Sequence, residues 1–473
     1  MNTKSRQQTV SEKALDINLD SLYYGSFAEI GAGQEVARQF FQAGKASQTI
    51  ALTISAYDMT FSDVIYGKEK SGRYVCDSRL RKMMNHEFNK LTERLGPDRG
   101  SKTCFFSFAD TVATSSDTNV TATAKKNAVS RSHGWMGLHF QHKPNAEPSE
   151  IYLHVRLLDK QRLPQQETLS KLGVNLIHSC FYKTKNSNDF IISLFDHIKQ
   201  GSLSIDALHF NGEVFKNFDE CHTNLTLIEL GYSEAIFFNA EGAVQNPADA
   251  LWGKNIFIQR AFYKPVTNTH IDIAERGLKH FINEFNLKPS ETMSIFEFTL
   301  NNRIKNESVS MDEAVLKVKM LQALKIPTLV SRFSLFYELK EFIRLSTDKP
   351  LGIVIGATHL EKLFDEKFYF DLSGGLLEGM GKLLGRFSRL YIYPHKTNEI
   401  CLLTKSFFPP AAIKNIYKHF IDNKMIQDIA GCDDITEFIH STDILKMLKA
   451  KNSNWKKYVP SQIHGIVSKE IKE

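Results

Sequence analysis

The chain has 473 residues and a formal net charge of +6, with 42% hydrophobic and 24% charged residues. This composition is typical of a folded protein with more than one core and excludes a largely disordered chain. The polar first 20 residues lack the apolar segment of a secretory signal, and no apolar run approaches the ~20 residues of a membrane helix. The six cysteines are scattered without CxxC spacing, which indicates a reducing compartment and a cytoplasmic protein.

The N-terminal part predicts a flexible leader at residues 1–20, followed by strands and amphipathic helices. A glycine-rich stretch, YGSFAEIGAGQEVARQFF (24–41), leads into the first helix, whose apolar positions recur at helical spacing. Two buried strands, 48–56 and 103–110, flank a helix at 78–95. Residues 111–132 are rich in Thr, Ser and Asn and predict a mobile loop, which serves either as a lid or as a plain connection.

Beyond this loop the pattern changes twice. Residues 135–141 and 150–158 alternate and predict an antiparallel pair. From residue 174 onward, strands and helices alternate in a way that favours parallel pairing. The strands expected here are 174–182, 204–210, 235–239 and 255–263, and the helices are 189–199, 224–230 and 270–285.

A second alternation of strands and helices starts after a domain boundary expected near residue 265. Strands are predicted at 293–300, 328–332, 351–357 and 390–394, with helices at 311–324, 334–345 and 376–384. We therefore expect an α/β protein with two mixed or mostly parallel sheets and flanking helices. Its domains are 21–265, a doubly wound domain at 266–400, and a helical C-terminal region at 401–473.

The first candidate site is the turn expected between Gly25 and Gly33. Glycines allow the backbone to approach an anion, and a helix N-terminus attracts one. The residues that would bind a phosphate are Gly25, Ser26, Phe27, Gly31 and Gly33. The stretch is neither a Walker A loop nor a GxGxxG fingerprint. A purely structural strand-to-helix turn therefore stays open.

Acidic residues at strand ends form the second candidate. Asp58, Asp110 and Asp159 each follow a predicted strand, where ligands bind in open α/β sheets. Asp58 and Asp110 could hold Mg²⁺ or act in catalysis as a base. The alternative is that these aspartates begin turns or cap helices.

Two further groups could contact a substrate. Arg131 and His133 precede Trp135, where the loop re-enters the sheet, and are candidate catalytic residues. Ser373, Gly374 and Gly375 precede a helix and could bind an anion, or form a plain turn. Histidines are frequent between residues 133 and 209, but no HExxH arrangement supports a zinc site. These residues could equally lie in the core or on the surface: His133, His139, His142, His154, His178 and His209.

Several blocks of the sequence resemble an uncharacterised bacterial family that is well represented in cyanobacteria. They are YGSFAEIGAGQEVARQFF, LTISAYDMTFSDVIYG, FFSFADTVAT, SHGWMGLHFQ, GVNLIHSCFY, LVSRFSLFYEL and SGGLLEGMGKLL. Members of that family carry the automatic labels nicotinate-nucleotide adenylyltransferase and TonB-dependent receptor. The receptor label does not fit a chain that alternates helices and strands and lacks an export signal.

The adenylyltransferase label has a visible source in Gly25-Ser26-Phe27, which matches the Gly-x-Phe turn of that superfamily. The paired histidines that follow it in the superfamily are replaced here by Ile30 to Gln34, so no catalytic residue is carried over. What the resemblance implies is a nucleotide or another phosphorylated metabolite at this turn.

We therefore expect a soluble protein that binds a nucleotide-like or phosphorylated small molecule, and, if it is an enzyme, a nucleotidyltransferase or related transferase. Lys125, Lys126 or Arg131 would close over the phosphate, and Mg²⁺ would assist. The alternative is a non-catalytic scaffold or regulatory partner. Basic residues do not cluster on one element, which disfavours nucleic acid as a partner, while a homo-oligomer stays open.

Overall fold

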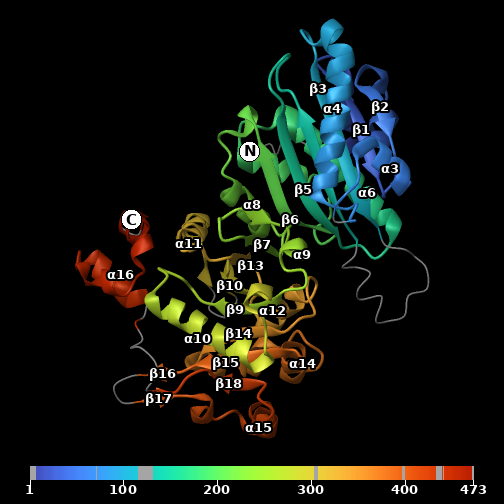
Figure 1. The fold of residues 1–473 in the computed structure, drawn as a ribbon. Coiled ribbons are helices and arrows are strands. Elements are labelled where there is room, and N and C mark those ends of the chain that lie inside the picture. Colours follow the sequence, from blue (N-terminus) through green and yellow to red (C-terminus); the bar gives the residue numbers. More distant parts are fainter. Residues whose placement is uncertain are drawn as a thin grey trace, which may run out of the picture. The chain divides into compact units, whose positions relative to one another are not determined.

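The structure is a computed structural model that describes residues 7–70, 72–114, 132–302, 307–396, 400–432, 439 and 441–470. It has the predicted α/β fold class, with one large sheet in each of two compact units, Met1–Glu234 and Ala235–Glu473 (Figure 1). The division falls before residue 265 because strand β7 (Ala235–Phe238) pairs with β13 (Thr328–Ser331) of the second sheet. In the described part of the chain, no helix is long and apolar enough to cross a membrane.

The first unit contains a six-stranded sheet with the order β2-β1-β3-β4-β5-β6. Its first three strands are parallel, and the last four form antiparallel neighbours, which confirms the predicted antiparallel pair. The strands are β1 (Tyr23–Ile30), β2 (Ile50–Ile54), β3 (Cys104–Ala113), β4 (His133–Phe140), β5 (Ser149–Leu157) and β6 (Leu203–Asn211).

Helices of this unit depart from the sequence predictions at two places. Helix α1 (Val10–Leu19) lies within the expected leader, because Thr9 caps it and Ala14 and Ile17 are fully buried against its neighbours. Residues 174–182 belong to helix α6 (Arg162–Tyr182), so the strand predicted there is wrong. The other helices are α2 (Glu35–Ala43), α3 (Met59–Tyr66), α4 (Asp77–Arg99), α7 (Ser187–Leu194) and α8 (Glu220–Glu229).

The second unit contains an eight-stranded sheet with the order β18-β15-β14-β9-β10-β13-β7-β8. From β9 (Asn255–Arg260) the chain adds β10 (Thr292–Thr299) and β13 on one side, all parallel. It then returns to the other side of β9 and adds β14 (Leu351–Gly356), β15 (Ser388–Tyr393) and β18 (Ile426–Asp428), also parallel. The strand order therefore reverses between β9 and β14, as in doubly wound folds.

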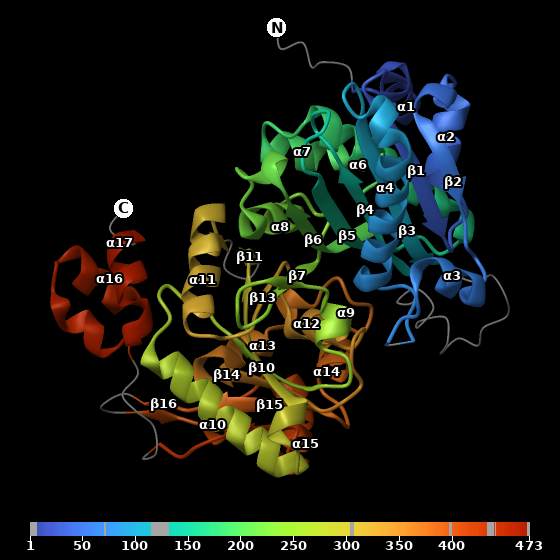
Figure 2. The same cartoon turned by 45° about the horizontal axis from the view of Figure 1, so that its top comes forward.

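Helices cover both faces of this second sheet (Figure 2). On one face, α10 (Asn268–Phe285) packs with Phe257 and Tyr391. The opposite face packs against α12 (Phe336–Ile343), α13 (Leu360–Leu363), α14 (Gly375–Leu383) and α15 (Lys414–Asp422). The remaining elements of this part are β8 (Val244–Gln245), α9 (Pro247–Ala250), β11 (Asn301–Asn302), β12 (Glu307–Ser308), α11 (Met311–Ala323) and β16 (His395–Lys396).

The C-terminal region is not purely helical. It holds α16 (Ser441–Lys449) and α17 (His464–Glu470), but also β17 (Cys401–Leu402) and β18, which completes the sheet. Cys401 and Cys432 form a disulfide with their Cα atoms 6.1 Å apart, a pairing that their separation in the sequence does not indicate. Cys104 and Cys180 are free and buried, as expected of small core residues.

Candidate functional site

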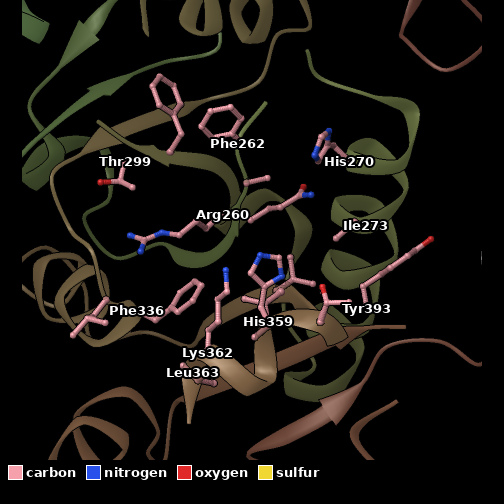
Figure 3. Close-up of a pocket in the computed structure, with 18 of the residues that line it drawn as sticks. Arg260, Phe262, His270, Ile273, Thr299, Phe336, His359, Lys362, Leu363 and Tyr393 are labelled. Atoms are coloured by element: carbon pink, nitrogen blue, oxygen red, sulfur yellow. The ribbon is translucent and has the colours of Figure 1, made fainter. Parts of the chain in front are cut away.

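A cavity of about 320 Å³ lies beyond the carboxyl ends of β9 and β14, where the strand order of the second sheet reverses (Figure 3). Strand β9 contributes Gln259 and Arg260 to its lining, and β14 contributes Val354 and Ile355. The short 3₁₀ helix η4 (Ala357–His359) and α13 follow β14 directly and form another part of the wall. The topology thus places this cavity where doubly wound proteins bind their ligands.

Gln259 is a buried polar residue of this wall. Along β9, Ile256 and Ile258 face one side of the sheet and Phe257 faces α10, so strand alternation places Gln259 on the α10 side. The residue is only 2% exposed, and its Oε1 has no hydrogen-bond partner in the described part of the chain. A buried polar atom without a partner costs about 1–3 kcal/mol, which a ligand that donates a hydrogen bond would recover.

Arg260 is held in one orientation at the tip of β9. Its Nη2 donates to Oε1 of Glu297 at 3.0 Å, and these two residues are in register on β9 and β10. Nη1 donates to the carbonyl of Ser334 at 3.3 Å, and the guanidinium lies 4.8 Å from the centre of the Phe336 ring. Glu297 balances the positive charge of Arg260. The guanidinium therefore offers the cavity N–H donors in a fixed orientation, and little net charge.

Lys362 and His359 add further basic groups. Both extend into the cavity toward the side chain of Arg260 (Figure 3). Lys362 is exposed and forms no ion pair within the described chain. Among the described lining residues there is no aspartate or glutamate. The cavity therefore favours an anionic group.

Aromatic rings line the rest of the cavity. Phe262 is 40% exposed, and the buried ammonium of Lys317 lies 3.9 Å from the centre of its ring. Tyr393 is buried and donates from its hydroxyl to Oδ2 of Asp272 at 2.7 Å. Rings of this kind can pack on a planar ligand, and the phenylalanines Phe262, Phe298 and Phe336 present theirs to the cavity.

His270 lines the same cavity but has a structural role at the start of α10. Its Nδ1 accepts a hydrogen bond from the backbone N–H of Thr267 at 3.0 Å, which closes a capping box. Burial lowers the pKa of His270 to about 4, so its ring is neutral at pH 7. The arrangement as a whole can take a flat, largely apolar ligand that carries an anionic group.

The glycine-rich stretch predicted as a phosphate-binding turn differs from that expectation. Gly25, Ser26 and Phe27 lie inside β1, where the buried ring of Phe106 leaves no room for a side chain at Gly25. The turn itself holds Gly31 and Gly33, with φ angles of +102° and +91°. These positions favour glycine for conformational reasons.

The helix N-terminus after this turn is occupied by the protein itself. The carboxylate of Glu29 accepts hydrogen bonds from the backbone N–H groups of Val36 and Ala37, each at 2.9 Å. These are the donors that a phosphate would use. A carboxylate of the protein also takes a backbone donor of the second expected anion-binding turn, which consists of Ser373, Gly374 and Gly375. Oε2 of Glu378 accepts a hydrogen bond from the N–H of Gly374 at 2.9 Å.

The predicted acidic residues have different surroundings. Asp58 caps α3, with its Oδ1 accepting from the N–H of Phe61 at 2.8 Å. Asp110 is fully buried and in register with Glu29. Burial and the charge of Glu29 raise the pKa of Asp110 well above its usual range. Within the described residues, no group of three or more His, Cys, Asp and Glu side chains could hold a metal, and a Mg²⁺ site stays a prediction.

His133 lies at the start of β4 and contacts His154, whereas Arg131, Lys125 and Lys126 lie outside the described residues. Arg260, His359 and Lys362 were not among the site residues predicted from the sequence. A signal for them existed, because both 255–263 and 351–357 were predicted as strands and basic residues stand at or just beyond their carboxyl ends.

No family model and no curated protein matches the chain. Among solved structures, the competence/damage-inducible protein CihA from Agrobacterium tumefaciens is 15% identical, covers 36% of this chain and 93% of its own, and has a TM-score of 0.26. A CinA superfamily protein from Enterobacter cloacae is 11% identical, covers 38% of this chain and 97% of its own, and has a TM-score of 0.28. Similarity at this level supports no conclusion about this chain.

Proposed function

We propose that the second unit binds a nucleotide-like or phosphorylated small molecule in the cavity beyond β9 and β14. The observation that carries this proposal is the position of the cavity at the reversal of strand order, with a basic and aromatic lining free of described carboxylates. A transferase reaction at phosphate is the reaction class that such a ligand suggests.

Each part of the lining has a role in this proposal. Lys362 and His359 face the anionic group, and the oriented guanidinium of Arg260 adds donors to it. The planar part of the ligand packs on Phe262 and Phe336. Gln259 accepts a hydrogen bond from the buried part of the ligand, which satisfies its Oε1.

A thermal-shift screen of the full chain tests this proposal. The panel holds ATP, GTP, NAD, nicotinate mononucleotide, sugar phosphates and pyrophosphate, each with and without Mg²⁺. A ligand at 100 times its Kd stabilises the folded protein by about 2.7 kcal/mol, which gives a clear rise in melting temperature. A Mg²⁺-dependent hit selects the substrate for an activity assay.

A pair of lysine variants locates the binding. Lys362→Ala removes the basic group that points into the cavity and should abolish most of the shift. Lys279→Ala removes an exposed lysine on α10 outside the cavity and should leave the shift unchanged. A flat panel, or a shift that Lys362→Ala leaves intact, contradicts the proposal and favours a scaffold protein.

A further inference from the structure

Three polar side chains form a chain across neighbouring strands of the first unit. His133 on β4 places its Nδ1 3.0 Å from Nε2 of His154 on β5. Nδ1 of His154 lies 3.2 Å from Oδ2 of Asp206 on β6. His154 and Asp206 are almost completely buried, whereas His133, the outermost of the three hydrogen-bonded side chains, is partly exposed.

The direction of these hydrogen bonds follows from the charge of Asp206. Arg156 donates from Nε to both oxygens of this carboxylate, at 3.0 and 2.8 Å. Burial acts to raise the pKa of Asp206, but the charge of Arg156 and the bonds from His154 and Arg156 outweigh it and hold the pKa below its usual range. Asp206 is therefore ionised at neutral pH and can only accept hydrogen bonds.

The negative charge of Asp206 sets the direction of the first hydrogen bond, because Nδ1 of His154 must donate to a carboxylate that only accepts. When Nε2 of His154 accepts from Nδ1 of His133, the free electron pair of His133 is on Nε2. This is the arrangement on which the proposal rests. Burial and the neighbouring His154 lower the pKa of His133 to about 4, with Arg73 acting in the same direction and Asp206 against it. The ring of His133 is therefore neutral at physiological pH.

A further buried polar group lies beside these three hydrogen-bonded side chains. Trp135 is two residues after His133 on β4, on the same face of the sheet, and its ring centre is 5.1 Å from that of His154. Its indole N–H is buried and has no hydrogen-bond partner among the described residues. The region thus combines an oriented basic nitrogen with an unused donor.

We propose that His133 is a catalytic base of a second site, in the first unit, and that His154 and Asp206 are its positioning residues. Its substrate class is a hydroxyl compound or water. The O–H bond breaks as the proton moves to Nε2 of His133, and the electron pair of that bond stays on the oxygen as an alkoxide or hydroxide. The resulting imidazolium keeps its Nδ1–H bond to His154, and Asp206 compensates the positive charge. This proposal is independent of the ligand proposed for the second unit.

Modification by diethyl pyrocarbonate tests whether Nε2 of His133 carries a free electron pair, and it does not require that the substrate be known. Nε2 attacks a carbonyl carbon of the reagent, an N–C bond forms and an anhydride C–O bond breaks. The ethyl carbonate that leaves takes up the proton released from Nδ1 and decomposes to carbon dioxide and ethanol. Mass spectrometry of peptides gives the rate at each histidine of the full chain. An unperturbed histidine loses about tenfold in rate from pH 7.5 to 5.5. His133 should keep its rate over this interval.

Asp206→Asn tests the positioning residues, since Arg156 will take the amide oxygen and leave the amide N–H₂ group facing His154. Nδ1 of His154 then accepts, the proton order reverses, and Nε2 of His133 becomes protonated, so its rate should fall at least about tenfold. Glu220→Gln is the matched control, because Glu220 pairs with His209 in the same unit and should not affect His133.

Nitrogen-15 NMR of the unmodified protein gives the same answer without a variant. It should show the Nδ1–H tautomer at both His133 and His154. A proton on Nε2 of His133, a rate for His133 that falls with pH like that of exposed His86, or an unchanged rate in Asp206→Asn would each overturn the proposal.

Discussion

Gln259 combines a cost in stability with a benefit in binding. Its buried Oε1 has no partner in the described chain, so replacement by an apolar side chain of similar shape should stabilise the free protein. We expect Gln259→Met to raise the free energy of unfolding by about 1 kcal/mol and to weaken ligand binding in the thermal-shift screen. Urea denaturation without ligand measures the first effect. A loss of stability in the free protein would instead assign Gln259 a structural role.

The buried pair of Glu29 and Asp110 makes stability depend on pH. Burial raises the pKa of Glu29 to about 7, although hydrogen bonds from Ala37 and Val36 oppose this. This pKa lies above the unfolded value of 4.5. The contribution of Glu29 to the free energy of unfolding is therefore fully present below pH 4.5 and is lost as pH rises through 7.

We expect Asp110→Asn to make this decline shallower, because it removes a second buried carboxyl group whose pKa is also raised well above its usual range. Denaturation between pH 5 and 8 measures the slope. Asp58→Asn serves as the control, since asparagine still caps α3 and the position is exposed. Equal slopes for the natural protein and Asp110→Asn would contradict this account of the pair.

At the scale of elements, the contact between α6 and α2 depends on a single glycine. A Cβ atom at Gly173 would lie 2.4 Å from Cγ2 of Val36 and 3.2 Å from the ring of Phe108. We expect Gly173→Ala to lower the free energy of unfolding by about 1–3 kcal/mol. Gly381→Ala in α14 is the matched control, because a Cβ atom there would have no neighbour within 4 Å and alanine is the better helix former. A neutral Gly173→Ala would show that α6 can shift away from α2.

The sequence predicted the strands well where neighbouring residues alone decide the structure. The alternation in 135–141 and 150–158 predicted an antiparallel pair, and the structure has β4 and β5 there, with β4 buried on both faces over most of its length. Residues 174–182 misled because nearly every side chain of this part of α6 is buried, and a fully buried helix and a buried strand both appear as apolar runs. The turn was expected to begin at Gly25, but Gly25 lies inside β1, and its missing side chain makes room for the ring of Phe106.

At the scale of the whole molecule, the candidate site could not be predicted because it depends on strand order. The residues at the ends of β9 and β14 are far apart in the sequence, and only the return of the chain across β9 makes these strands neighbours. Local patterns predicted both strands but not their pairing. The position of Arg260 and Lys362 near the ends of predicted strands was therefore their one signal, and other basic residues near strand ends share it.

The central claim is that an anionic, nucleotide-like ligand binds beyond β9 and β14. Photolabelling of the full chain with 8-azido-ATP, followed by mass spectrometry of peptides, tests its location most directly. We predict labelled peptides that contain residues 259–262 or 354–363, and their loss when excess unlabelled ATP competes. Labels confined to peptides of the first unit, or labels that ATP does not displace, would contradict the claim.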